Sequence, residues 1–193
     1  MSSEAVLYEI DRLPIAEIPT QMATAQITPD NNAVLAEIFI AAPPERVFQA
    51  FTDPAQLPFW WGSKDVYRIT NYRSDLRPGG KWKSIGVAPD GKPFQVDGEY
   101  LEVDPPRLIV HTWNPSFAHL HHTVVRIEFI PQDVHGLQAR GPQRVGTGTL
   151  VKIRHEGFAG DVAQAKGHGE GWVRVLGWMQ AFVETGATAD TRS

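Results

Sequence analysis

The stretch HEGFAGDVAQAKGHGEGW, residues 155–172, lies where the chain changes from a strand-like to a helical pattern. The segment GTLVKIRHE (148–156), which leads into it, is rich in β-branched and apolar side chains, as is typical of a strand. Apolar residues then recur at helical spacing up to Gly186, which suits a helix end. They are Trp172, Val175, Leu176, Met179, Phe182 and Val183. We therefore expect a last strand, a joint and one long C-terminal helix.

Two interpretations of this stretch compete, because it combines two histidines, one aspartate and two glutamates with five glycines. In the first it is a joint, where Gly157 and Gly160 permit a sharp turn and Phe158 fills the core. His155 and His168 then make polar contacts near the helix start. In the second it is a metal site with the ligands His155, Asp161, His168 and Glu170. The stretch contains neither HxxxH nor HExxH, so we favour the joint and predict no bound metal.

Upstream of the joint, strand-like segments follow one another with short turn signals such as RPGG, PDGK and DPP between them. The segments are 66–73, 80–87, 93–103, 107–113, 123–130 and 148–156, after an earlier strand at 33–42. Longer connections occur at 114–122 and 131–147, and the second predicts a mobile hairpin tip. This spacing predicts an antiparallel meander.

Two short helices are expected after the first strand. Pro43 and Pro44 suit the start of one helix, and Asp53 with Pro54 suits the start of the other. Pro58 should limit the second helix to about one turn. The order of elements predicts an α+β fold, with an antiparallel sheet of about seven strands and the long helix laid across it. A cavity can remain where a curved sheet leaves the helix.

The domain organisation expected from these elements is simple. Apolar residues show no regular spacing in residues 1–30, which predicts an N-terminal extension. Residues 31–186 are expected to form one domain, and residues 187–193 a C-terminal tail.

Composition excludes several classes of function. The chain has 193 residues and a net charge of -4, which gives no basic surface for nucleic acid. No apolar run of about 18 residues occurs, so no membrane span is expected. The first residues lack the pattern of a secretory signal, which favours a cytoplasmic location. Cysteine is absent, which excludes disulfides, thiolate metal sites and cysteine nucleophiles.

Four segments carry a resemblance to a known family. They are APPERVFQAFTDPAQLPFWWG (42–62), LRPGGKWK (76–83), GEYLEVDPPRLIVHTW (98–113) and HEGF…HGEGWVRVLGWMQAF (155–182). The chain resembles the SRPBCC (START and birch-pollen-allergen-like) superfamily. Within it, the chain is most similar to the AHSA-type branch, named after the C-terminal domain of the Hsp90 ATPase activator. The resemblance implies a helix-grip fold, in which a curved antiparallel sheet grips the C-terminal helix around a cavity.

The resemblance also implies a function, with alternatives. We expect the cavity to bind a small hydrophobic or aromatic ligand, without a cofactor. The alternatives are an interaction module that modulates a chaperone ATPase in the stress response, and a cyclase- or hydrolase-type enzyme. The first needs an exposed patch, and the second needs a titratable group in the cavity. The expected oligomeric state is a monomer or a homodimer.

Aromatic and histidine side chains are the candidates for ligand contacts, because large aromatics line apolar pockets as well as cores. The predicted ligand-binding residues are Trp60, Trp61, Trp82, Tyr100, His111, Trp113, His155 and Trp172. Ile109, His111 and Trp113 share one face of their strand, so His111 is the best polar candidate if that face points inward.

Other motifs give little support to catalysis or metal binding. His119, His121 and His122 could suit zinc, but a polar loop is favoured, because no carboxylate follows at a motif spacing. No GxSxG or phosphate-binding loop is present. Glu99 and Glu102 are expected on opposite strand faces, which excludes a carboxylate dyad. No catalytic residue is therefore predicted.

Overall fold

The computed structural model describes residues 22–117, 123–134 and 146–191. Within these ranges the chain forms nine strands and three helices. The strands are β1 (Thr24–Ile27), β2 (Ala33–Ile40), β3 (Gly62–Ser63), β4 (Tyr67–Ser74), β5 (Lys81–Val87), β6 (Pro93–Asp104), β7 (Leu108–Pro115), β8 (Thr123–Val134) and β9 (Gly146–Glu156). The helices are α1 (Pro44–Thr52), α2 (Leu57–Trp60) and α3 (Val162–Thr185). None of these helices combines the length and the apolar character needed to cross a bilayer.

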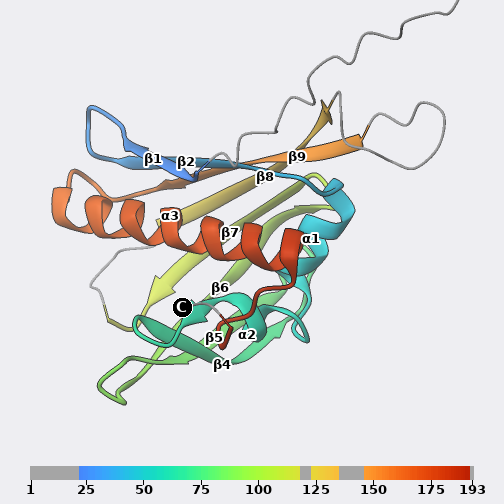
Figure 1. Cartoon of the computed structure of the whole chain (residues 1–193). Helices are drawn as coiled ribbons and strands as arrows, with labels where there is room; N and C mark the ends of the chain where they lie inside the picture. The colour runs from blue at the N-terminus through green and yellow to red at the C-terminus, as the bar shows by residue number, and fades with distance from the viewer. Residues whose placement is uncertain (1–21, 118–122, 135–145, 192–193) are drawn as a thin grey trace, which may run out of the picture.

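All the strands form one antiparallel sheet in the order β1-β2-β9-β8-β7-β6-β5-β4-β3, and the sheet curves around α3 (Figure 1). The predicted α+β helix-grip fold is confirmed, with nine strands in place of about seven. The additional strands are β1 and β3. Every residue of β1 is exposed or half-buried, so β1 lacks the apolar alternation that identifies a strand in sequence. It lies within the predicted extension 1–30, and residues 1–21 lie outside the described residues.

The helix α3 has the ends and the buried face that its sequence predicts. The Asp161 side chain caps the first turn by accepting a hydrogen bond from the Gln164 N–H at 3.0 Å. Gly186 ends the helix in the left-handed conformation, with φ of 75°. Trp172, Leu176 and Met179 are buried against the sheet. Apolar burial along this face therefore fixes how α3 lies across the sheet.

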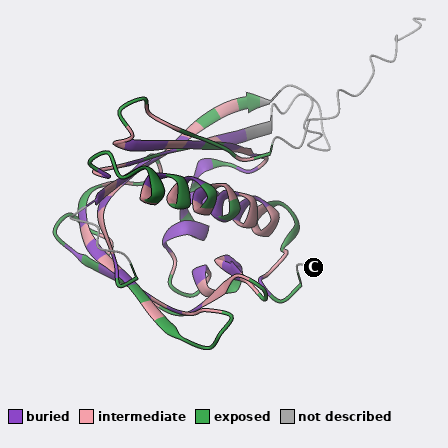
Figure 2. Cartoon of the chain, turned by 90° about the vertical axis from the view of Figure 1, so that its left-hand side faces the viewer, coloured by how far each residue is buried: buried purple, intermediate pink, exposed green. Residues whose placement is uncertain are grey.

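The two halves of the sheet lie at different distances from α3. At Gly169 a side-chain carbon would lie 3.7 Å from Val34 and 3.9 Å from Ala25, so the helix backbone approaches β1 and β2 closely. The other half curves away from the helix (Figure 2). β-Bulges at Thr70 in β4 and Leu101 in β6 interrupt the pairing there. Bulges bend and twist a strand, which favours this curvature.

The short helices close one end of the fold. Phe48 and Phe51 of α1 pack edge-on against Phe129 of β8, with ring centroids 5.4 and 6.3 Å apart. After α3 the chain returns to α2, where the Ala189 N–H donates to the Phe59 carbonyl at 2.7 Å. Ala189 is buried, so this part of the predicted C-terminal tail packs on the domain.

Two details differ from the sequence predictions. The second helix begins at Leu57, with Pro58 in its first turn, where a missing N–H costs little. Asp53 instead accepts from the Ala55 N–H in the preceding turn. Glu99 and Glu102 are both exposed, because the bulge at Leu101 shifts the alternation by one residue. Each pairs with a basic side chain, Lys81 and Arg126 respectively, so they still form no dyad.

Two predicted features lie outside the described residues. These are the three histidines at 119–122 and most of the 131–147 connection. The first residues of that connection belong to β8, and its last residues belong to β9.

Candidate functional site

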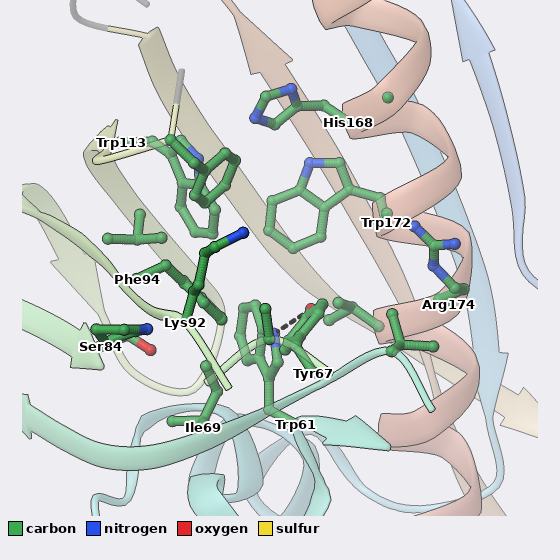
Figure 3. A pocket seen from close by; sticks show the side chains of 18 of the residues that line it. Trp61, Tyr67, Ile69, Ser84, Lys92, Phe94, Trp113, His168, Trp172 and Arg174 are labelled. Atoms are coloured by element: carbon green, nitrogen blue, oxygen red, sulfur yellow. Dashed lines mark hydrogen bonds between the residues drawn. The ribbon is translucent and has the colours of Figure 1, made fainter. Parts of the chain in front are cut away.

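A cavity of about 590 Å³ lies between α3 and the half of the sheet that curves away from it. Its walls come from β4 to β7, from the turn after α2 and from one face of α3 (Figure 3). The volume falls within the range of small-molecule sites. The sheet curvature therefore leaves space that side chains do not fill.

Three tryptophans from distant parts of the chain form one wall of the cavity, here called the indole cluster: Trp61, Trp113 and Trp172. The Trp61 and Trp113 rings stack with centroids 6.5 Å apart, and Trp172 lies 5.7 Å from Trp113. The Trp61 N–H donates to the Tyr67 hydroxyl at 2.9 Å (Figure 3). Burial raises the pKa of Tyr67 to about 12, so this hydroxyl stays neutral. The wall is aromatic and uncharged.

Two glycines of α3, here called its bare face, line the cavity beside His168 and Trp172 of the same helix. Gly167 and Gly171 are four residues apart and both line the space. A side-chain carbon added at either position would have no heavy atom within 4 Å. Gly177 of the same helix is equally unobstructed, but it does not line the cavity.

His168 is the histidine that lines the cavity within the described residues. Its Nδ1 lies 2.9 Å from the Gln164 carbonyl, which can only accept, so Nδ1 carries the proton. The other nitrogen, Nε2, is then a bare acceptor, and Figure 3 shows the ring pointing from α3 toward the space. Burial lowers the pKa of His168 and favours this neutral form.

His155 lies behind the indole cluster and connects it to the sheet. Its Nδ1 accepts from the Trp172 N–H at 3.1 Å, so its own proton is on Nε2, which donates to the Thr123 hydroxyl at 2.9 Å. That hydroxyl donates to the Trp113 carbonyl at 3.0 Å. Burial, and then the nearby His168 and His111, lower the pKa of His155 well below its ordinary value. The imidazole is therefore held neutral as a structural link.

Comparisons with known proteins place this architecture in a family. The model of the family described as "Activator of Hsp90 ATPase homolog 1-like protein" matches residues 41–137, half of the chain. The chain belongs to this family. The predicted AHSA-type membership is therefore confirmed. No curated protein matches the chain.

Solved structures share the fold of this family member at low sequence identity. A protein from Rhodobacter sphaeroides has a TM-score of 0.67 at 17% identity, over 84% of this chain and 97% of that one. An AHSA1-like protein from Aeromonas hydrophila has a TM-score of 0.56 at 21% identity, over 79% and 93%. CalU16 from Micromonospora echinospora has a TM-score of 0.53 at 20% identity, over 86% of both chains. These similarities concern the fold alone.

In this AHSA1-like chain the eight predicted ligand-binding residues lie in three places. Trp61, Trp113 and Trp172 line the cavity. Trp82, Tyr100 and His111 line a separate void of about 20 Å³, which Trp61, Ser84 and Trp113 also border. Trp60 and His155 line neither space; the Trp60 N–H donates to the Ala50 carbonyl within the core.

His111 points inward, as the alternation of its strand allowed. It is buried in the small void, with its ring centroid 4.9 Å from that of Trp82. Its Nδ1 contacts the Thr112 carbonyl at 3.1 Å, and burial lowers the pKa of His111 to about 4. The void has room for about one water molecule, and His111 does not line the larger cavity.

The joint between strand and helix is confirmed, with Phe158 buried and Gly157 and Gly160 at positive φ. The described residues contain no group of three or more His, Asp or Glu side chains placed to hold a metal ion. Sequence reasoning missed the bare face of α3, although glycines four residues apart inside a helical pattern were a usable signal. It also missed Tyr67 as a residue of the cavity wall, because an aromatic residue type alone does not show whether the side chain lines a cavity.

Proposed function

We propose that this protein binds a small hydrophobic or aromatic molecule in the cavity between α3 and strands β4 to β7. The observation that supports the proposal is the bare face of α3. Glycine inside a helix costs about 1 kcal/mol relative to alanine. At Gly169 close packing against the sheet gives a structural reason for the absence of a side chain. At Gly167, which is exposed, and at Gly171, which is half-buried, no such reason exists within the described structure, and both positions line the cavity.

Alanine at these positions will separate stability from binding. We expect G167A and G171A each to raise the free energy of unfolding by about 0.5–1 kcal/mol, because the helix gains propensity and nothing obstructs the methyl group. G177A is the matched control, with the same gain expected at a position outside the cavity. Urea denaturation measures all three. If G167A or G171A lost stability while G177A gained it, the glycine at that position would be needed for packing.

Larger side chains test the binding itself. In G171L the new side chain will occupy the space of a ligand, and we expect the affinity for a neutral naphthalene fluorophore, 6-propionyl-2-(dimethylamino)naphthalene, to fall at least tenfold. G177L serves as the control and should bind the fluorophore as the wild type does. Equal binding by G171L and the wild type would contradict the proposal. Native mass spectrometry of both proteins, followed by denaturing extraction, would then identify any molecule that co-purifies with the wild type alone.

The two alternative functions have less support. An enzyme of cyclase or hydrolase type was expected to use His111 or His155, and neither lines the cavity; among the described residues, the titratable imidazole that lines it is that of His168. A chaperone-facing module needs an exposed apolar patch. The exposed large apolar side chains of the described residues come from five separate segments: Met22, Phe59, Leu101, Phe117 and Val162.

A further inference from the structure

Charged side chains are found at the rim of the cavity, outside its aromatic interior. Asp90, Lys92 and Arg174 all line it. Asp90 and Lys92 pair with each other at 2.6 Å, and both are largely exposed. Arg174 makes no ion pair in the described part of the chain. Among the residues that line the cavity, two cations and one anion leave a surplus of one positive charge.

The two cations approach the cavity from different sides. Lys92 is in the turn between β5 and β6, where its amino group pairs with Asp90. Arg174 lies on α3, one turn after the bare face. Its charge acts on the Tyr67 hydroxyl in the cavity wall and partly opposes the effect of burial on the pKa of that group. A ligand seated against the indole cluster would therefore have its outer end within the field of this charge.

We propose that the cavity takes a flat aromatic molecule with one acid group, whose rings lie against the indole cluster and the bare face of α3. The acid group lies at the rim, within the field of Arg174. One anionic group compensates the single surplus charge there, and at the exposed rim it keeps most of its hydration. An acid in the interior would lose that hydration among indoles. This inference rests on the proposed function and specifies the class of ligand.

A matched pair of probes tests the acid group. 2-Naphthoate and 2-naphthamide have nearly the same shape, and only the first carries a charge at pH 7.5. We expect isothermal titration calorimetry at low salt to show about fivefold tighter binding of 2-naphthoate, the size typical of one exposed ion pair. The preference should shrink in 0.5 M NaCl. In R174Q the two probes should bind equally.

Lys166 provides the control. It is an exposed cation on the same helix that does not line the cavity, so K166Q should keep the full preference for 2-naphthoate. Equal binding of both probes to the wild type, or a preference that persists in R174Q, would overturn the acid assignment and leave the cavity proposal standing. If neither probe bound, both proposals would fail.

Discussion

Replacing His155 with alanine will lower the free energy of unfolding by about 3 kcal/mol, because the change removes a fully buried ring and leaves a cavity. It also leaves the buried Trp172 N–H without an acceptor, which by itself costs about 1–3 kcal/mol. Urea denaturation at pH 7.5 measures the loss. A decrease below about 1 kcal/mol would show that the linked hydrogen bonds contribute little.

A double-mutant cycle with W172F isolates the hydrogen bond from the cavity effect. Phenylalanine keeps the aromatic ring at 172 but removes the donor, so the H155A and W172F losses should not add. We expect a coupling of about 1 kcal/mol between them. H168A is the comparison variant: the His168 ring packs 4.9 Å from that of His155, but its only hydrogen bond in the described residues goes to a carbonyl of its own helix, so its loss should be smaller than that of H155A.

Acidification will destabilise the protein between about pH 6.5 and pH 4. The folded-state pKa of His111 is about 4 and its ordinary value is 6.5, so in this window the unfolded chain binds a proton that the folded chain does not. Stability is therefore complete above pH 6.5 and falls as the pH decreases toward 4, by about 3 kcal/mol for His111 alone. His155 contributes in the same direction, because its pKa is also lowered by burial.

The slope of this pH dependence identifies its source. Each buried neutral histidine contributes about 1.4 kcal/mol per pH unit near pH 5. Unfolding free energies of the wild type at pH 7.5, 6.0, 5.0 and 4.5 give the slope. H111Q should reduce the slope near pH 5 by about 1.4 kcal/mol per pH unit, the contribution of one histidine. An H111Q slope equal to that of the wild type would exclude His111 as a cause.

The elements with strong periodic patterns were predictable from sequence, and those set by local irregularities were not. The helix α3 has a sustained apolar face and a glycine stop, so both its existence and its end were predicted. Strand β1 has no buried residue, so its sequence shows no alternation of apolar side chains. It is identified as a strand by its pairing with β2 in the structure. The bulge at Leu101 reverses the expected side of Glu102, because alternation fixes a face only while pairing stays in register.

The candidate site was predicted in part, because residue type alone does not separate a core side chain from a cavity wall. Trp60 and Trp61 are neighbours in sequence, yet Trp60 is sealed in the core and Trp61 borders the space. The difference depends on where the sheet curves away from α3, which is a property of the whole fold. His168 could be identified as a polar group near the helix start, but its exposure to the cavity could not.

The bare face of α3 also affects how this chain can evolve. Any glycine codon becomes an alanine codon by a single base change. At Gly167 and Gly171 such a change meets no neighbouring atom within 4 Å, so the fold would tolerate it and only the cavity would change shape. A single substitution could thus reshape the cavity without compensating changes in the core.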